Sequence, residues 1–518
     1  MKKFKVLLIG LYNSKALGVR YLSSVLQQAG HEVDIIYFKD FNSLNASSPT
    51  EREYELLLEQ IRKSAPDMIG LSVMSSFYIE VAKEMSRRIR QTFSETPFIW
   101  GGVYATLIPD ESLEYCDYLM RGECEEAILE LVEAFQGQRA FTNVANLTFR
   151  QKQITSSSTV ANSSTVASSA SEIITNDLRP LTAHLDTIPF PDMGGNNMVH
   201  ITGDKVNCCD PQVSSISYEM SASRGCPYVC SYCSSLNMKR LYKGKGPFVR
   251  QRSVQNTMEE LLMAKSKMKN LRMVWFWDEI FADDEEWVQE FVTAYKKEIN
   301  LPFNIWGHPL KIKKNIMDML VDAGLHQIVV GLQHGSPRIR KEIYFRPETD
   351  EQIIEMSKVL SEAKVPEVIF DLILDSPFES VEDLEMTYHL CMKLHKPFKL
   401  QMHGLHFLPG TDIEKVAVRK GVLSWEDLKK QQNRPIEEQY RSFLWWTHTG
   451  SHEDRERAYW KIMIYLTQFG WTSRMMPVFQ RDLFKRKPEL MNILRTSANG
   501  WNLMRRASRK ALMKLGLT

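Results

Sequence analysis

Three cysteines lie close together in the sequence at positions that suit an iron–sulfur cluster. Cys226, Cys230 and Cys233 follow the spacing CxxxCxxC on one short segment. Cysteine thiolates hold cubane clusters of four irons, which ordinarily take four such ligands. Three thiolates therefore leave one iron open to a small chelating molecule. The segment predicts a redox cofactor with a vacant coordination position.

Zinc is the alternative metal for clustered cysteines, because paired thiolates often hold a structural zinc ion. A tetrahedral zinc site requires a fourth Cys or His nearby, and the only other cysteines close in the sequence are Cys208 and Cys209. Adjacent cysteines are poor partners for a single tetrahedral ion. The sequence therefore favours the iron–sulfur cluster over zinc.

The cysteine segment must be positioned by the strands and helices around it. A strand is predicted directly before it, and each of the later strands is followed by a helical pattern. The predicted strands cover residues 217–222, 273–277, 303–307, 327–332, 367–374 and 399–407. Repeated strand–helix units predict a barrel whose chemistry lies at the carboxyl ends of the strands.

The first part of the chain also alternates strands and helices. Strands are predicted over residues 5–9, 32–38, 68–73 and 98–100, and helices over 18–29, 78–93 and 123–135. This alternation predicts an α/β unit with a doubly wound parallel sheet, whose ligands bind outside the carboxyl ends of the strands. The loops at 11–17, 72–77 and 101–107 are therefore the expected binding positions.

Composition limits the classes of protein that the chain can belong to. Its 518 residues predict about three domains, and the net charge of +2 gives no general nucleic-acid surface. Eight cysteines, three of them clustered, do not make a disulfide framework, which favours a reducing, cytoplasmic location. No apolar run approaches the roughly 20 residues that span a bilayer.

The cysteine segment RGCPYVCSYC (residues 224–233) resembles the loop of the radical S-adenosylmethionine enzymes, in which an aromatic residue, here Tyr232, precedes the last cysteine. The resemblance implies that Cys226, Cys230 and Cys233 bind a 4Fe-4S cluster and that S-adenosylmethionine chelates the open iron. The reduced cluster would then cleave this cofactor to a 5′-deoxyadenosyl radical. The resemblance also implies a partial (β/α)6 barrel in place of a closed eight-stranded one.

Residues near the predicted strand ends of that barrel are candidates for cofactor and substrate contacts. The element GLQHGS (residues 331–336) resembles one of the family, with Gln333 in place of an acid and His334 in place of a small hydroxyl residue. By position, Asp278, Gln333 and Arg346 could contact the ribose, amino or carboxylate groups of S-adenosylmethionine. His334 is the candidate catalytic residue, and a satisfied core histidine is the alternative.

The first unit resembles the cobalamin-binding domain that precedes many radical S-adenosylmethionine domains. The matching pieces are GLSVMSS (70–76), GGVYAT (101–106) and DYLMRGE (117–123), with Ser72, Gly101, Gly102 and Tyr104 as cofactor-binding candidates. A nucleotide-binding or purely structural unit is the alternative. The family's lower-ligand motif DxHxxG would fall near residues 11–18, which contain no histidine. Cobalamin is therefore expected without a protein imidazole under its cobalt.

The predicted function is that of a cobalamin-dependent radical S-adenosylmethionine enzyme, similar to the anaerobic magnesium-protoporphyrin ester cyclase and to cobalamin-dependent methylases. Methyl transfer to an unactivated carbon of a small-molecule or lipid-like substrate is the favoured reaction, with flavodoxin or ferredoxin as the electron donor. Oxidative cyclisation or rearrangement by the same radical chemistry is one alternative. The other is a non-catalytic protein that senses cobalamin or redox state.

Four segments are predicted along the chain. They are a cobalamin-binding domain (1–145), a linker with a flexible Ser-rich insertion (146–213), the radical barrel (214–430) and a helical C-terminal region (431–518). In the last segment, residues 481–518 carry ten basic side chains against two acidic ones. They predict a basic amphipathic helix that contacts a membrane surface, with packing on its own domain as the alternative.

Overall fold

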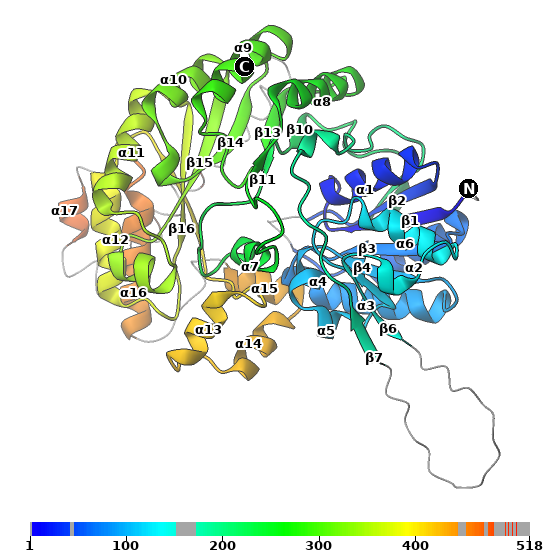
Figure 1. Cartoon of the computed structure of the whole chain (residues 1–518). Coiled ribbons are helices and arrows are strands. Elements are labelled where there is room, and N and C mark those ends of the chain that lie inside the picture. Colours follow the sequence, from blue (N-terminus) through cyan, green and yellow to red (C-terminus); the bar gives the residue numbers. More distant parts are fainter. Residues whose placement is uncertain are drawn as a thin grey trace. The chain divides into compact units, whose positions relative to one another are not determined.

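The computed structural model describes residues 3–41, 46–151, 172–443, 452–470 and 475–480, with isolated positions beyond residue 480 (Figure 1). These residues form two compact units, each with its own large sheet. Unit 1 comprises Met1–Ala183, Thr187–Pro211 and Arg240–Pro247, and unit 2 comprises His184–Asp186, Gln212–Lys239 and Phe248–Thr518.

A nine-stranded sheet forms the middle of unit 1, in the order β7-β6-β5-β4-β3-β1-β2-β8-β9. Its parallel centre contains β1 (Lys5–Leu11), β2 (Glu32–Phe38), β3 (Met68–Ser72), β4 (Phe98–Gly101) and β5 (Tyr118–Met120). Between them run α1 (Leu17–Gln28), α2 (Glu51–Ser64), α3 (Ile79–Thr92), α4 (Val103–Leu107) and α5 (Pro109–Ser112), and α6 (Ala127–Phe135) follows β5. The strand order reverses beside β1, as in doubly wound sheets, and this confirms the predicted fold class.

The central strands of unit 1 are apolar because helices cover both faces of the sheet. In β1, Val6, Leu7 and Ile9 are at most 1% exposed, which is the pattern of a strand buried on both sides. Side chains also specify the helix ends: Thr50 and Glu53 form a capping box at the start of α2. Burial thus accounts for strand β1, and local side-chain capping accounts for the start of helix α2.

The segment predicted as a linker belongs largely to unit 1. Its strands are β6 (Leu147–Gln151) and β7 (Glu172–Thr175), which pair antiparallel, and β8 (Met198–Thr202) and β9 (Lys205–Asn207) at the other sheet edge. Arg20 on α1 forms a two-bond ion pair with Asp210 at 2.7 and 2.9 Å, and both side chains are at most 2% exposed. This buried pair ties the segment to α1, and this stretch of unit 1 continues to Pro211. The Ser-rich residues 152–171 lie outside the described residues.

Six parallel strands in the order β10-β13-β14-β15-β16-β17 form the sheet of unit 2. They are β10 (Ser217–Met220), β13 (Met273–Phe276), β14 (Phe303–Gly307), β15 (Leu325–Gln333), β16 (Glu367–Ile373) and β17 (Lys399–His403). The helices after them are α8 (Val254–Lys267), α9 (Glu285–Glu298), α10 (Lys314–Asp322), α11 (Asp350–Glu362) and α12 (Val381–Lys393), on the outside of the sheet (Figure 1). The predicted partial six-unit barrel is confirmed.

Alternation along the strands separates the two faces of this sheet. In β13, Val274 and Phe276 are fully buried, and Phe276 packs against Phe291 of α9 and Phe303 of β14. Trp275, between them, points to the opposite face because successive side chains of a strand alternate. The outer face is therefore the apolar core of the barrel, and the inner face is available for other chemistry.

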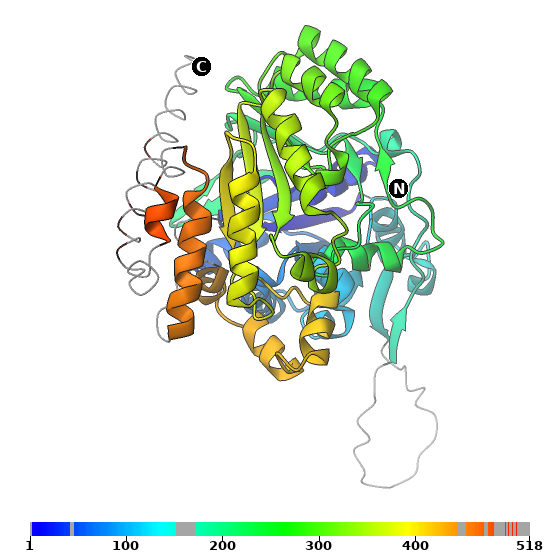
Figure 2. The ribbon, with the colours of Figure 1, turned by 90° about the vertical axis from the view of Figure 1, so that its left-hand side faces the viewer.

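Helices after the barrel complete unit 2. They are α13 (Asp412–Arg419), α14 (Trp425–Gln432), α15 (Ile436–Phe443), α16 (His452–Leu466) and α17 (Met476–Phe479). The α16 helix runs alongside α12 (Figures 1 and 2), where Trp460 packs on Tyr388 with ring centroids 5.5 Å apart. The helical C-terminal region is thus confirmed. Residues 481–518 lie almost entirely outside the described residues, so their membrane contact stays a prediction.

Candidate active site

The cysteine loop connects β10 to α7 (Ser234–Leu241). Just before the cysteines, β11 (Ser223–Arg224) pairs with β12 (Arg250–Gln251), and Gly225 has a φ of +93°. A Cβ added to Gly225 would lie 2.1 Å from the Phe248 carbonyl oxygen. Only glycine therefore allows the loop to pass this close to the returning chain.

Ser231 fixes the middle of the loop and is fully buried. Its N–H donates to the Tyr344 carbonyl at 3.1 Å, and its carbonyl accepts from the N–H of Ile413 at 2.9 Å. Its hydroxyl also donates to the Ile343 carbonyl at 2.5 Å. Cys230 and Cys233 flank this anchored point, so two of the predicted ligands are held from both sides.

The three thiols of the loop are near enough to interact electrostatically. All three are free and partly buried, and the neighbouring thiol of Cys230 adds charge repulsion that helps to raise the pKa of Cys226 and of Cys233. Burial is the larger cause and raises the pKa of Cys226 to about 11 and that of Cys233 to about 12, so iron binding would release their protons. Within the described part of the chain, no group of three Cys, His, Asp or Glu converges as a single ion requires.

Arg346 links the cysteine loop to the end of β15. Its Nη1 donates to the Tyr232 hydroxyl at 3.1 Å and lies 3.9 Å from the sulfur of Cys230. Its Nη2 donates to the Gly331 carbonyl at 2.6 Å, and its Nε pairs with the buried carboxylate of Glu348 at 2.5 Å. This geometry places a fixed positive charge beside a predicted cluster ligand, where the carboxylate of S-adenosylmethionine would find a suitable partner.

Tyr232 and Asp278 have structural partners in the described chain. The Tyr232 ring packs edge-on against Tyr344 at 5.2 Å. Asp278 is 1% exposed, and its carboxylate accepts from the N–H of Ala222 at 3.1 Å and from the Ser223 hydroxyl. Burial raises the pKa of Asp278 to about 6. Asp278 therefore fixes the entry to the cysteine loop, and its geometry gives no support to the predicted cofactor contact.

Gln333 carries an unsatisfied polar atom at a strained position. It ends β15 after a register shift, with a φ of +64°, and its side-chain oxygen is buried without a hydrogen-bond partner. A Cβ on Gly331 would lie 2.4 Å from the Gln333 amide nitrogen, so Gly331 makes room for this side chain. A buried acceptor without a partner suits a donor on a bound molecule. The predicted contact with S-adenosylmethionine is consistent with this geometry.

His334 is enclosed by the protein. Its Nδ1 accepts from the Ser336 N–H at 3.0 Å, which leaves the proton on Nε2, 3.1 Å from a Glu379 oxygen. Both His334 and Glu379 have fully buried side chains. Because both ring nitrogens already have partners, the geometry supports a positioning role. The predicted catalytic role of His334 has no support in this arrangement.

Sequence reasoning missed part of the network under the loop. Tyr228 stacks on His308 with ring centroids 3.6 Å apart, and burial lowers the pKa of His308 to about 3. Glu348, the partner of Arg346, lies 3.9 Å from His308 Nε2. Tyr228, Glu348 and Ser231 gave no sequence signal of a role, because neither their burial nor their partners follow from spacing.

In unit 1, the loops after β3 and β4 meet at the carboxyl edge of the sheet. The Val73 N–H donates to the Gly101 carbonyl at 2.8 Å, and the Tyr104 N–H donates to the Val73 carbonyl at 3.2 Å. Gly102 has a φ of +99°, and an added Cβ would lie 2.6 Å from the Val73 oxygen. The predicted candidate Gly102 thus allows the two loops to pack together, and Gly101 contributes its carbonyl to their contact.

The same edge offers an apolar surface for a flat cofactor. Ser72 ends β3, and Met74 beyond it is 55% exposed although its side chain is apolar. Tyr104 is buried, with its hydroxyl near Glu111, so it supports the loop from behind. Met74 is thus an exposed apolar side chain beside two close-packed loops, in a position that a bound corrin would cover. The residues present therefore fit cobalamin.

No histidine lies in the loops at residues 11–17, 72–77 and 101–107. Tyr12 takes the position after β1, with a φ of +53°, and stacks on Tyr78 with centroids 4.7 Å apart. His31 directly precedes β2, which places it at the opposite, amino edge of the sheet. Cobalamin without a protein imidazole under the cobalt stays a prediction, and these placements are consistent with it.

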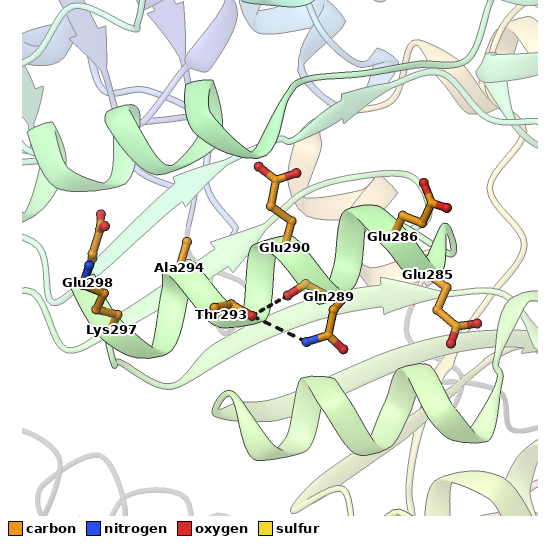
Figure 3. Close-up of a pocket in the computed structure, with 8 residues that line it drawn as sticks. All are labelled: Glu285, Glu286, Gln289, Glu290, Thr293, Ala294, Lys297 and Glu298. Atoms are coloured by element: carbon orange, nitrogen blue, oxygen red, sulfur yellow. Dashed lines mark hydrogen bonds between the residues drawn. The ribbon is translucent and has the colours of Figure 1, made fainter.

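A hollow on the outside of the barrel contains none of the predicted site residues. Figure 3 shows its lining, which comes from α9 alone: Glu285, Glu286, Gln289, Glu290, Thr293, Ala294, Lys297 and Glu298. Thr293 bonds the carbonyl of Gln289, one turn earlier on the same helix. This is a solvated helix face, and it carries no site chemistry.

Two family models match the chain. The B12 binding domain matches residues 11–132, and the radical SAM superfamily matches residues 220–391. These ranges fall on the doubly wound sheet of unit 1 and on the barrel of unit 2. Each matched range includes the loops described above.

Relatives and solved structures agree with these matches. An uncharacterized methyltransferase of Pyrococcus horikoshii is 23% identical over 416 residues, which are 79% of each chain. The anaerobic magnesium-protoporphyrin IX monomethyl ester cyclase of Cereibacter sphaeroides is 25% identical over 72% of this chain and 55% of its own. The structure of the cobalamin-dependent S-adenosylmethionine radical enzyme OxsB with aqua-cobalamin has a TM-score of 0.64 and 14% identity, covering 92% of this chain and 75% of that one.

The barrel, the cysteine loop and the family match define a radical S-adenosylmethionine enzyme. With its B12 binding domain, the chain belongs to the cobalamin-dependent enzymes of this class. Its cofactors are accordingly a 4Fe-4S cluster, S-adenosylmethionine and cobalamin. In the described part of the chain, no helix combines the length and the apolar character that a bilayer crossing needs.

Proposed function

We propose that this enzyme transfers a methyl group to an unactivated carbon of a small-molecule substrate. The observation that carries the proposal is the grouping of three free thiols around the anchored Ser231 in a chain that also has a B12 binding domain. A relative named as a methyltransferase matches 79% of the chain and supports the same reaction.

The side chains of the barrel hold and orient the reacting groups. When bound, the cluster with S-adenosylmethionine supplies a 5′-deoxyadenosyl radical, and cobalamin supplies the methyl group. Cys226, Cys230 and Cys233 would ligate the cluster. Arg346 would hold a carboxylate beside Cys230, and the unpartnered oxygen of Gln333 would accept a hydrogen bond from an amino or ribose group.

The electron donor and the location belong to the same proposal. A low-potential protein such as flavodoxin or ferredoxin would reduce the cluster in the cytoplasm. The tail at residues 481–518, with ten basic and two acidic side chains, would contact an anionic membrane surface and bring the enzyme near a lipid-like substrate.

Oxidative cyclisation is the second candidate reaction. It is favoured by the 25% identity to a protein named as a magnesium-protoporphyrin ester cyclase. A rearrangement would use the same radical, so both differ from methylation in the fate of S-adenosylmethionine. Methylation consumes one molecule as methyl donor in addition to the one that forms the radical.

Anaerobic reconstitution tests the proposal. The chain is loaded with iron, sulfide and hydroxocobalamin, reduced with dithionite, and given S-adenosylmethionine with a labelled methyl group. We expect 5′-deoxyadenosine, S-adenosylhomocysteine and labelled methylcobalamin. Replacing any of Cys226, Cys230 and Cys233 by alanine should lower 5′-deoxyadenosine formation by at least about hundredfold, because a cluster ligand is lost.

Two outcomes would decide against methylation. A fully loaded protein that forms neither nucleoside would support the non-catalytic sensor. A protein that forms 5′-deoxyadenosine without S-adenosylhomocysteine or methylcobalamin would support cyclisation or rearrangement.

A further inference from the structure

Three tryptophans form a surface on the inner face of the barrel, which we call the indole shelf. Trp275 and Trp277 come from β13 and the position after it, and Trp306 comes from β14. The ring centroids of Trp275 and Trp277 are 5.9 Å apart with planes 22° from parallel, and those of Trp277 and Trp306 are 5.6 Å apart. The shelf is continuous across two strands.

The shelf is not core packing. The helix-covered face of the same strands is filled by Val274, Phe276 and Phe303, which are fully buried, whereas Trp277 is 45% exposed. An exposed indole leaves a large apolar surface in contact with water, and such surfaces mark binding sites when they are grouped. Trp275 and Trp277 are stacked, and Trp306 is tilted by 32° from Trp277, so another flat ring is the ligand that best covers the open indole surface.

Two polar atoms beside the shelf have no partner. The indole N–H of Trp306 and the side-chain oxygen of Asn304 are buried without a hydrogen bond, and Asn304 as a whole is 1% exposed. Leaving such a group unpaired destabilises the protein unless a bound molecule supplies the partner. Asn304 and Trp306 lie on the same face of β14, because they are two residues apart on one strand. Together they would satisfy a ligand edge that carries one acceptor and one donor.

The far side of the inner face is polar and contains opposite charges in pairs. Glu367 accepts from Lys399 at 2.5 Å, and Asp371 lies 3.2 Å from Nε2 of His403. Both pairs join β16 to β17, which stand two and three strand spacings from β14, or about 10 to 15 Å away. Balanced charge on this wall favours a neutral, hydrogen-bonding group on the ligand over an ionic one.

The shelf also lies beside the radical chemistry. His308 follows Trp306 by two residues, just beyond the end of β14, and stacks on Tyr228 of the cysteine loop. A ligand on the shelf would therefore lie next to the loop that ligates the cluster. Radical abstraction requires the target carbon to be held close to the cofactor.

We infer that the substrate is a neutral, planar, π-conjugated molecule of two or more fused rings. It stacks on Trp275, Trp277 and Trp306, and a donor–acceptor edge such as a lactam bonds Asn304 and the Trp306 indole. This inference rests on the proposed function for the identity of the site, and it adds the chemical class of the substrate. The indole shelf is the specificity-determining element.

Binding of two matched probes to the reconstituted enzyme tests the inference. Quinolin-2(1H)-one is planar and has adjacent N–H and C=O groups, and decahydroquinolin-2-one has the same lactam without a flat ring. Equilibrium dialysis should show the planar probe binding at least about tenfold more tightly, because only a flat ring can stack on the indoles. Equal affinity for the two lactams would overturn the inference.

Substitutions of single tryptophans test whether quinolinone binds at the indole shelf. Trp277→Ala should weaken quinolinone binding by about tenfold and Trp277→Phe by less, because phenylalanine keeps part of the stacking surface. Trp425→Ala removes another exposed tryptophan, 55% exposed on α14, and should leave the affinity unchanged. Equal loss in Trp277→Ala and Trp425→Ala would contradict the assignment, as would no loss in either.

Two further measurements separate this inference from others. Displacement of quinolinone by S-adenosylhomocysteine would show that the shelf holds the adenine of the cofactor, and it would overturn the inference. Cleavage of S-adenosylmethionine is measured on the same preparation. If the enzyme cleaves S-adenosylmethionine but does not bind the planar probe, the inference about the substrate is overturned and the proposed function stands. If the enzyme binds the probe but does not cleave S-adenosylmethionine, the proposed function is overturned and the planar binding site stands.

Discussion

Buried charges hold the cysteine loop in place, and each has a partner. Arg346 pairs with Glu348 and reaches the sulfur of Cys230, while Asp278 receives two hydrogen bonds from the segment that precedes the cysteines. A buried charge that loses its partner destabilises a protein by about 3 to 5 kcal/mol. The loop is therefore specified by side chains that are not themselves ligands.

Asp278 should make stability depend on pH. Burial raises its pKa from 3.8 to about 6, so the folded protein binds more protons than the unfolded one between these values. The free energy of unfolding should therefore fall as pH rises through this range, by about 3 kcal/mol in total. Asp278→Asn should remove this fall, because the amide does not ionise. Urea unfolding of the cofactor-free protein at several pH values between about 4 and 6.5 measures it.

The matched control is Asp318→Asn on α10, where the carboxylate is exposed and pairs with Lys314. It should keep the wild-type pH dependence. An unchanged slope in Asp278→Asn would mean that other groups produce the effect.

At the scale of elements, glycines with positive φ decide how closely two segments approach. Gly225 brings the cysteine loop against Phe248, and Gly102 brings the loop after β4 against Val73. In both places the atom that a Cβ would meet belongs to the backbone, which cannot rotate away. The cysteine loop of unit 2 and the loop after β4 in unit 1 thus both depend on a glycine with positive φ.

Gly225→Ala should displace the cysteine loop. The added Cβ would lie 2.1 Å from the Phe248 oxygen, so the loop must shift and iron incorporation should fall to less than about half. Iron and sulfide per chain after reconstitution measure the effect. Gly421→Ala is the control, because Gly421 also has a positive φ of +67° but nothing within 4 Å of its added Cβ. It should cost about 1 kcal/mol of stability and leave iron content unchanged.

At the scale of the whole molecule, each unit has its own sheet and its own buried core. Unit 1 contains the B12 binding match, and unit 2 contains the radical SAM match. A unit with its own core can keep its shape when the binding site of the other is damaged. Loading of the two cofactors should therefore be separable.

Separate loading is tested with one variant in each unit. Gly102→Ala should weaken cobalamin binding by at least about tenfold, because its Cβ would collide with Val73, and should leave the iron content unchanged. Cys226→Ala should lose the cluster and keep cobalamin. Gly30→Ala, with a φ of +87° and open space around it, is the control for unit 1. Loss of both cofactors in either variant would show that the sites depend on each other.

The strands and helices could be determined from the sequence alone, and the cluster ligands could be proposed from it. Apolar strand runs, alternating helices and the CxxxCxxC spacing are local patterns, so both sheets and the three cysteines could be inferred before any contact was known. The extension of unit 1 to residue 211 could not, because it depends on β8 beside β2 and on the pair of Arg20 with Asp210.

Tertiary structure decided which strand-end residues face a site. His334 and Asp278 lie at strand ends like Gln333, yet Glu379 engages Nε2 of His334 and the segment before the cysteines engages both carboxylate oxygens of Asp278, whereas the side-chain oxygen of Gln333 has no partner. The indole shelf likewise depends on tertiary structure. Its tryptophans come from two strands, and only the register between these strands places them on the same face of the sheet. Side-chain partners and faces arise from contacts between distant residues, and spacing along one chain does not contain them.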